Sequence, residues 1–315
     1  MPNVTAFVPS FEHARFIERT LRSIFAQTLL PQKLIVIDDG SKDESVKIIE
    51  LILKESPIEN TFISRENRGL CASLNEGLTL VDDGSEFFAY LGSDDIWLPD
   101  FLKEQTELLA MRPAASLAFS HAFVIDEHDN IIDRTDNWTD FADGNMLETL
   151  LGGEIMSSPG VIYRLPELKK FGWNEDAKLE DYELYLNLAA TGEFARNENI
   201  LCAWRRHDKN TSGATEIMLS EQIAAQRRVF PQMNISAEKL DELQGKLKFN
   251  ASAELIRNGD KHAAWRLIRE NYKHANGGSL IKNILRLLAP KALFNQNRER
   301  MRKANIAKYG KLKLK

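Results

Sequence analysis

Apolar and polar positions along the first hundred residues form blocks that predict strands followed by helices. The predicted strands are the uncharged runs at residues 4–8, 34–37, 61–63 and 87–91. After the first run, Ile17, Leu21 and Ile24 recur at helical spacing, and later runs are followed by similar patterns. Strands that alternate with helices are typical of a parallel sheet covered by helices on both faces. The sequence therefore predicts an α/β fold.

The pattern changes after the fourth strand. Residues 117–132 alternate and turn at 127–130, which predicts a hairpin, and residues 161–163 and 201–204 predict further short strands. Residues 179–186 predict the start of a helix with acidic residues in its first turn. Beyond residue 215 the chain predicts helices to its end. We place a boundary near residue 215 and expect the last 25 residues to be poorly ordered at their tip.

Composition and charge narrow the class of protein. The chain has 315 residues, of which 43% are hydrophobic and 28% charged, so neither a disordered nor a membrane-spanning protein is favoured. The net charge of -5 is unevenly distributed, because the segment from Ser279 onward holds 11 Lys or Arg and one acid, Glu299. Cys71 and Cys202 lie in apolar surroundings without metal-like spacing. We expect buried free thiols and, with no leader-like N-terminus, a cytoplasmic protein.

Acidic residues follow two of the predicted strands. Asp38 and Asp39 come after the second, and Asp94 and Asp95 come after the fourth. In open α/β sheets, ligands bind outside the carboxyl ends of the strands, and hard oxygen ligands there suit a divalent cation that holds a phosphate. The alternative is that these acids only cap the following helices. For the first pair, Ser41 with Glu44 already supplies a predicted capping box.

Six short motifs occur in order over about two hundred residues. They are Val8-Pro9-Ser10-Phe11, Ile37-Asp38-Asp39-Gly40-Ser41, Arg65-Glu66-Asn67-Arg68-Gly69, Leu91-Gly92-Ser93-Asp94-Asp95, Glu180-Asp181 and Trp204-Arg205-Arg206-His207. Together they resemble the family 2 inverting glycosyltransferases of the GT-A fold, over residues 3–212. The resemblance implies a Rossmann-like nucleotide-diphospho-sugar transferase fold, with a mostly parallel central sheet flanked by helices. We expect a catalytic domain at 1–215, with a nucleotide-binding half (1–97) and an acceptor half (98–215), and a C-terminal helical appendage at 216–315.

The resemblance implies a nucleotide site. Pro9, Ser10 and Asp39 match positions that bind the nucleotide, where the Asp39 carboxylate would accept the imide N–H of uracil or thymine. A UDP-sugar or dTDP-sugar donor is therefore favoured. Asn67 matches a polar residue near the base and Arg65 a possible phosphate contact, although either side chain could simply fix a turn.

The resemblance also implies a metal and diphosphate site. Asp94, Asp95 and His207 match residues that hold Mn²⁺ or Mg²⁺ against the two phosphates, and Arg205 and His207 match groups near the diphosphate. The family usually has an Asp where this chain has Gly92. That glycine leaves Asp94 as the principal predicted ligand, and it either weakens the site or lets the backbone approach the ligand more closely. The alternative for His207 is a structural histidine that follows a strand.

Asp181 resembles the catalytic base, with Glu180 as second candidate. Inversion requires one base that removes the proton of the acceptor hydroxyl, and a helix N-terminus helps to keep a carboxylate ionised. The alternative is that both acids only favour a helix start. Residues 157–160 match the acceptor side of the cleft, and Trp97 or Trp173 could stack on a sugar ring or belong to the core.

These expectations describe a metal-dependent enzyme that transfers a sugar to a glycan or lipid-linked oligosaccharide in bacterial surface-polysaccharide synthesis. The alternatives are a nucleotidyltransferase of similar fold and a protein that binds sugar nucleotides or glycans without turnover. The basic C-terminus could lie on the anionic inner face of the cytoplasmic membrane, or it could be a packed helix followed by a solvated tail. Nucleic-acid binding is disfavoured because the basic residues are terminal.

Overall fold

The computed structural model describes residues 2–138, 141–207 and 215–313. It contains one mixed sheet with the strand order β3-β2-β1-β4-β8-β6-β9-β5, and β7 pairs with β6 beside it. The strands are β1 (Val4–Ser10), β2 (Lys33–Asp38), β3 (Glu59–Ser64), β4 (Phe87–Tyr90), β5 (Ile96–Trp97), β6 (Ala115–Ile125), β7 (Ile131–Arg134), β8 (Val161–Arg164) and β9 (Glu193–Arg205). The α/β class expected from the sequence is confirmed.

The first four strands form the parallel part of the sheet. β1 pairs in parallel with β2 and β4, and β2 pairs in parallel with β3. All seven residues of β1 are buried, as expected for a strand that is covered on both faces. The connecting helices are α1 (Ile17–Phe25), α2 (Ser45–Leu53) and α3 (Leu70–Thr79). The carboxyl ends of β1, β2 and β4 therefore meet at one edge of the sheet.

The second half of the sheet is mixed. β8 lies antiparallel between β4 and β6, and the predicted hairpin is the antiparallel pair β6 and β7. β9 pairs in parallel with β6 through three register shifts and also reaches β5, where Trp97 lies opposite Cys202. This pairing carries the end of β9 to the loop between β4 and β5. The helices of this half are α4 (Phe101–Met111), α5 (Leu147–Leu151), α6 (Leu165–Lys169) and α7 (Tyr182–Thr191).

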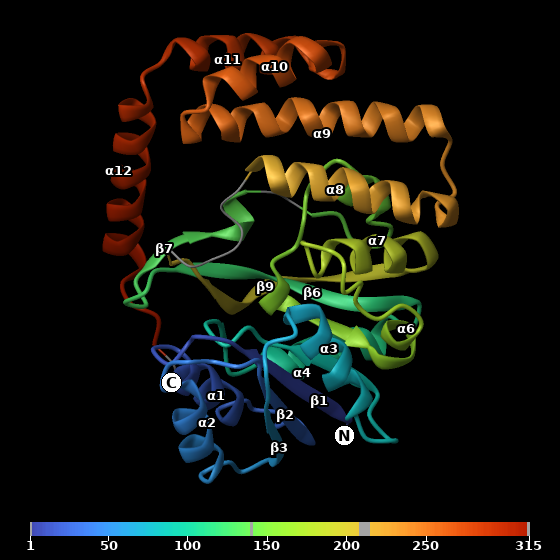
Figure 1. Cartoon of the computed structure of the whole chain (residues 1–315), viewed down its shortest axis with the longest axis vertical. Helices are drawn as coiled ribbons and strands as arrows, with labels where there is room; N and C mark the ends of the chain where they lie inside the picture. The colour runs from blue at the N-terminus through green and yellow to red at the C-terminus, as the bar shows by residue number, and fades with distance from the viewer. Residues whose placement is uncertain (1, 139–140, 208–214, 314–315) are drawn as a thin grey trace.

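The C-terminal helices stack beyond α7 at one end of the molecule (Figure 1). They are α8 (Thr215–Val229), α9 (Ala237–Asn258), α10 (Lys261–Asn271), α11 (Gly277–Leu288) and α12 (Lys291–Tyr309). α8 and α9 contribute Val229 and Leu240 to the same hydrophobic core as Tyr163 and Tyr182. The Gln226 side chain also donates a hydrogen bond to the Tyr182 hydroxyl at 2.7 Å. The expected helical C-terminal region thus shares its core with the sheet.

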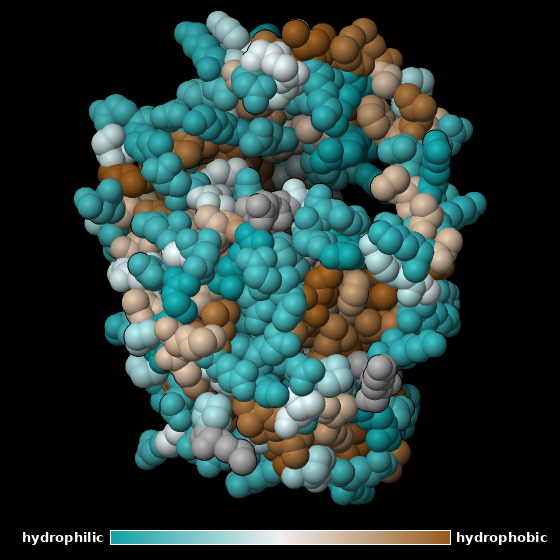
Figure 2. Space-filling view, turned by 180° about the vertical axis from the view of Figure 1, so that it is seen from behind, coloured by the Kyte–Doolittle hydropathy of each residue, from teal (hydrophilic) through white to brown (hydrophobic). Residues whose placement is uncertain are grey.

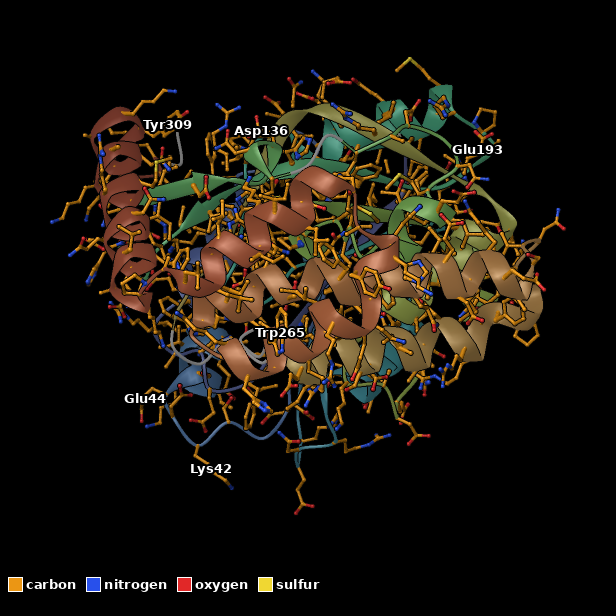
Figure 3. All side chains as sticks on the ribbon, turned by 90° about the horizontal axis from the view of Figure 1, so that it is seen from above. Lys42, Glu44, Asp136, Glu193, Trp265 and Tyr309 are labelled. Atoms are coloured by element: carbon orange, nitrogen blue, oxygen red, sulfur yellow. The ribbon has the colours of Figure 1, made fainter. Side chains whose placement is uncertain are left out.

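The end of the chain returns to the sheet. α12 stands at one edge of the molecule, contacts the end of α9 and runs back to β7 (Figures 1 and 3). The Ile131 amide donates to the Gly310 carbonyl, and the Leu312 amide donates to the Asp129 carbonyl at 2.8 Å. Leu312 is buried in a small cluster with Ile96 and Ile125. The expectation of a poorly ordered tip is therefore wrong up to residue 313, because a helix and a buried leucine fix this segment.

The sequence predicts both the start of α2 and the state of the two cysteines. The predicted capping box is wrong, because α2 begins at Ser45 and the Ser41 hydroxyl instead donates to the Asp38 carboxylate at 2.7 Å. The prediction for the cysteines is confirmed, since Cys71 and Cys202 are buried and free. Among the described residues, every helix is too short or too polar to span a bilayer.

Candidate active site

A pocket of about 570 Å³ opens at the carboxyl ends of β1, β2 and β4. Seven of the residues predicted from the sequence line it, namely Pro9, Ser10, Asp39, Asn67, Asp94, Asp95 and His207. Glu180 and Ser158 contribute to its wall from the second half of the sheet. Arg65, Arg205 and Asp181 are not part of the lining and lie behind residues that are. The fold therefore brings the two halves of the predicted site to one cavity.

The loop after β2 forms one end of the pocket, and Asp38 holds its backbone. Asp38 is fully buried and accepts hydrogen bonds from the Ser10 hydroxyl at 3.0 Å and from the Ser41 amide at 2.9 Å. Gly40 has φ +84, and a Cβ there would lie 2.8 Å from the Asn67 amide nitrogen. Only glycine allows the loops after β2 and β3 to approach this closely.

The Asp39 carboxylate lies at the junction of these two loops. It accepts hydrogen bonds from the backbone amides of Arg68 at 2.9 Å and Gly69 at 2.7 Å, and it forms an ion pair with Arg65. Arg65 also contacts Glu76 at 2.9 Å and the Ser73 hydroxyl at 2.9 Å. A carboxylate has about four acceptor positions, so three contacts leave one for a ligand. Arg65 thus orients Asp39, and its predicted phosphate contact stays a prediction.

Two histidines and one aspartate gather at the other end of the pocket. His207 Nε2 lies 2.9 Å from one carboxylate oxygen of Asp94, and His13 Nδ1 lies 3.8 Å from the other. One ligand atom from each of the three residues falls within 4.8 Å of the others, which is a spacing that suits one metal ion. Burial alone would raise the pKa of Asp94, but the hydrogen bond with His207 and the proximity of His13 outweigh it and lower that pKa.

Asp95 has different surroundings from Asp94. Its carboxylate accepts a hydrogen bond from the Arg205 amide at 2.8 Å, and its carbonyl accepts one from the Thr20 hydroxyl at 2.8 Å. Burial, followed by the charge of Asp94, raises the pKa of Asp95 well above its usual range. The structure therefore brings Asp94 and His207 together as predicted, while Asp95 lies outside the three-residue group. The metal role of Asp95 stays a prediction.

Arg205 lies behind this end of the pocket and is almost fully buried. Its guanidinium donates to the Asp94 carbonyl at 2.7 Å and to the Asp126 carbonyl at 2.9 Å, and it forms an ion pair with Asp129 at 2.7 Å. It also lies 4.8 Å from the ring centre of Phe16, a cation–π distance. Arg205 therefore fixes the backbone of the acidic motif and connects it to the turn between β6 and β7.

The acidic pair at the start of α7 lies across the cavity. Asp181 is the residue before the helix, and Glu180 lines the pocket. Burial, with the charge of Glu180 as second cause, raises the pKa of Asp181 well above its usual range, and burial also raises the pKa of Glu180. Tyr163 and Tyr185 stack nearby with ring centres 6.5 Å apart. A buried carboxylate with a raised pKa is a stronger base once it is ionised.

The two candidate stacking tryptophans belong to the core. Trp97 is fully buried and donates to the Pro159 carbonyl at 2.8 Å, and its ring stacks on Phe101. Trp173 is also buried and packs edge-on against Tyr90. Neither side chain reaches the pocket lining. The second interpretation of these residues, as core aromatics, is the one that the structure supports.

His13 is the main site residue that the sequence reasoning missed. It lies in the loop after β1, two residues beyond Phe11, and the other members of its group come from distant segments. A histidine directly after a strand-end motif was a usable signal, because such loops reach the ligand crevice. Trp204 also lines the pocket, and its motif alone does not predict a role for its side chain.

Comparison with known proteins agrees with this geometry. The sequence model of glycosyl transferase family 2 matches residues 5–166. The chain is 25% identical to chondroitin synthase of Escherichia coli over 214 residues, which is 67% of this chain and 30% of that protein. It is also 23% identical to an uncharacterised glycosyltransferase of Nostoc sp. over 262 residues, which is 81% of this chain and 80% of the relative. The chain thus spans under a third of the chondroitin synthase.

Solved structures confirm the fold. A mannosyltransferase from Pyrobaculum calidifontis in complex with GDP-Man and Mn²⁺ superimposes with a TM-score of 0.62 at 15% identity, covering 98% of this chain and 86% of that one. TarS of S. aureus (residues 1–349), in complex with UDP, superimposes with a TM-score of 0.58 at 14% identity, covering 94% and 92%. At these identities the likeness establishes the expected GT-A fold alone.

Proposed function

Because the chain belongs to glycosyl transferase family 2, we propose that it is a metal-dependent inverting glycosyltransferase that uses a nucleoside-diphosphate sugar. The acceptor in this proposal is a hydroxyl of a glycan or lipid-linked oligosaccharide in bacterial surface-polysaccharide synthesis. The observation that carries the proposal is the single pocket that joins the Asp39 loop, the group of His13, Asp94 and His207, and the carboxyl group of Glu180.

The donor would lie along the carboxyl ends of β1, β2 and β4. Asp39 has one acceptor position left for the imide N–H of uracil or thymine, so a UDP-sugar or dTDP-sugar is favoured. Pro9, Ser10 and Asn67 would border the nucleotide. Asp94 and His207 would hold Mn²⁺ or Mg²⁺, with Asp95 beside them, and such an ion supplies positive charge for the departing diphosphate. Arg205 keeps the backbone of this acidic motif in place.

Asp181 is the proposed base. Its carboxylate takes the proton of the acceptor hydroxyl as that oxygen attacks the anomeric carbon opposite the diphosphate. Support comes from its position next to Glu180, which lines the pocket, and from its raised pKa, which makes the ionised group a stronger base. Ser158 would contact the acceptor side of the cavity.

A donor panel tests the proposed reaction. UDP-, dTDP- and GDP-sugars are incubated with the protein and Mn²⁺, and the release of nucleoside diphosphate is measured with and without glycan acceptors. We expect release from a uridine or thymidine donor, and loss of that release in Asp181→Asn with nucleotide binding retained. Release of pyrophosphate instead would indicate a nucleotidyltransferase. Binding without any turnover would indicate a sugar-nucleotide binding protein, and near-normal transfer by Asp181→Asn would exclude that base.

The C-terminal helices carry a second part of the proposal, which is peripheral contact with an anionic membrane where lipid-linked acceptors reside. α11 packs Leu280 and Leu287 inward but exposes Ile281, Ile284, Leu285 and Leu288. Figure 2 shows apolar side chains at the top of the molecule, where Figure 1 places α10 and α11. Trp265 of α10 is half exposed at this end (Figure 3). Lys282 and Arg286 lie one turn apart on one side of the apolar stripe, and basic residues beside an apolar face are typical of interfacial helices.

Vesicle sedimentation tests the membrane contact. Vesicles that contain anionic phosphatidylglycerol should bind the protein more strongly than neutral vesicles. Leu285→Glu should abolish this binding, whereas Met111→Glu, a change at an exposed apolar residue of α4, should not. Equal binding of both variants would show that α11 is not the contact. The proposed location is the cytoplasm, at the inner face of the membrane.

A further inference from the structure

The group of His13, Asp94 and His207 has two nitrogen donors and one carboxylate. The three residues come from the loop after β1, the loop after β4 and the segment that follows β9. His13 and His207 lie almost perpendicular to each other, with ring centres 5.4 Å apart. Side-chain exposures of 20% for His13, 13% for Asp94 and 7% for His207 describe a sheltered site that still opens to the pocket.

The loop that carries His13 is held firmly. The His13 amide donates to the Ser45 hydroxyl at 3.1 Å, and the Nδ1 atom of His13 lies 2.7 Å from the Ser93 hydroxyl. The preceding residue, Glu12, has φ 57, a conformation that costs a non-glycine residue about 1 kcal/mol or more. The Glu12 carboxylate accepts a hydrogen bond from the Lys42 amide at 2.7 Å, which offsets part of that cost. These contacts keep the His13 ring facing Asp94.

Gly92 explains why an imidazole takes this place. A Cβ at position 92 would lie 3.0 Å from an Asp94 carboxylate oxygen and 3.1 Å from an Asp95 carboxylate oxygen. Both distances are shorter than ordinary contacts, so the acidic side chains occupy the space that an additional carboxylate would need. Asp95 is meanwhile engaged by the Arg205 amide. The donor beside Asp94 and His207 is therefore supplied by His13.

We propose that His13 is a direct metal ligand and that the site selects transition ions such as Mn²⁺, Co²⁺ or Zn²⁺ over Mg²⁺. The inference rests on the proposed metal dependence and adds a ligand and a selectivity to it. Mg²⁺ requires near-ideal octahedral oxygen ligands and gives up its waters reluctantly, whereas the first-row transition ions bind mixed nitrogen and oxygen sites, with Mn²⁺ the weakest of that series. A set with two imidazoles therefore binds Mg²⁺ poorly, even though a single carboxylate is present.

Metal titration with an independent spectroscopic readout tests the proposal. Affinities for Mn²⁺ and Mg²⁺ are measured by calorimetry with and without UDP, and nitrogen couplings to bound Mn²⁺ are measured by pulsed electron paramagnetic resonance. Wild type should show two coupled imidazole nitrogens, and His13→Ala should show one, with Mn²⁺ affinity reduced about 10-fold to 100-fold. His13→Asp should lower the preference for Mn²⁺ over Mg²⁺ by at least about tenfold, because an oxygen donor replaces nitrogen.

The control is His262→Ala, because His262 is an exposed histidine of α10 outside the pocket lining. It should leave the metal affinities and both nitrogen couplings unchanged. Two coupled nitrogens in His13→Ala, or Mn²⁺ affinity within twofold of wild type, would overturn the proposal. Two couplings in wild type without any sugar transfer would retain this ligand assignment and refute the proposed function. Sugar transfer by a protein that binds no metal would refute the ligand assignment and retain the glycosyltransferase activity.

Discussion

Gly92 lies beside Asp94 and Asp95, and the sequence alone does not say whether its lack of a side chain weakens metal binding. The family usually has an Asp at this position, so Gly92→Asp would restore the metal site if the glycine impaired it. In the structure, a Cβ at this position would lie 3.0 Å from an Asp94 oxygen and 3.1 Å from an Asp95 oxygen, whereas ordinary contacts begin at about 3.4 Å. Any side chain at position 92 would therefore push one or both carboxylates away. We expect damage, not repair.

The size of the effect follows from these distances. To reach ordinary contact, the carboxylates must retreat by roughly 0.3 to 0.4 Å, which exceeds the ~0.2 Å within which metal–ligand distances are normally held. Displaced ligand geometry typically lowers metal affinity by about 10-fold to 100-fold, or ~1.4 to 2.8 kcal/mol. Gly92→Ala should show this steric effect alone. Gly92→Asp adds a third carboxylate beside Asp95, whose pKa is already raised. The folded state of Gly92→Asp should therefore be less stable than that of Gly92→Ala.

Calorimetric titration of Mn²⁺ in the presence of UDP measures the effect. Thermal unfolding without metal separates a general loss of stability from a change at the site. The matched control is Gly84→Ala, because the nearest atom to a Cβ at Gly84 is 3.9 Å away and the affinity should not change. Tighter Mn²⁺ binding by Gly92→Asp than by wild type would refute the reasoning and show that the glycine impairs the site.

Three further changes test other parts of the structure. Asp181→Asn should lower transfer by about 100-fold or more and remove the acid limb of its pH dependence, since the raised pKa of Asp181 makes wild-type transfer increase with pH. The folded protein keeps the Asp181 proton to a higher pH than the unfolded chain does, so wild type loses stability as pH rises from the usual aspartate pKa to the raised one. Above this pH window, calorimetry should show that Asp181→Asn is more stable than wild type. Arg205→Lys keeps the charge but loses the planar donors to Asp94 and Asp126, so chemical denaturation should show a loss of about 3 kcal/mol. Leu312→Ala should cost the docked tail about 2 kcal/mol and speed amide exchange at residues 129–131 about 30-fold, as hydrogen exchange would show.

The parallel strands and their terminal acids could be predicted because their signal is local. Each strand of the first half contains a short uncharged run, and the polar residues at its end must lie at the carboxyl edge of the sheet. Asp39 and Asp94 are therefore expected at the same edge, and both line the pocket. Membership of the family was equally accessible, because it depends on the order of motifs along the chain.

The composition of the metal group could not be predicted in the same way. His207 and Asp94 are 113 positions apart, and their contact depends on the pairing of β9 with β6 through three register shifts. No periodic pattern specifies such shifts. The sequence did reveal that Gly92 departs from the pattern, but the sign of its effect depends on where the neighbouring carboxylates point. The docking of Leu312 on Asp129 is also a contact between distant segments, which charge counts alone do not indicate.

Three aspartates of the site acquire different properties from their surroundings. His207 and His13 keep the pKa of Asp94 low and favour its ionised, metal-binding form, whereas burial raises the pKa of Asp95 and of Asp181. Neighbouring carboxylates of one residue type can thus take separate roles.

Arg205 connects this division of roles to the rest of the chain. Its amide holds the Asp95 carboxylate, and its guanidinium holds the Asp94 carbonyl and pairs with Asp129. Asp129 in turn accepts the hydrogen bond from the Leu312 amide at the end of the chain. If these contacts couple the end of the chain to the metal group, Leu312→Ala should weaken Mn²⁺ binding as well as loosen the turn between β6 and β7. An unchanged Mn²⁺ affinity beside faster exchange would limit the tail to a structural role.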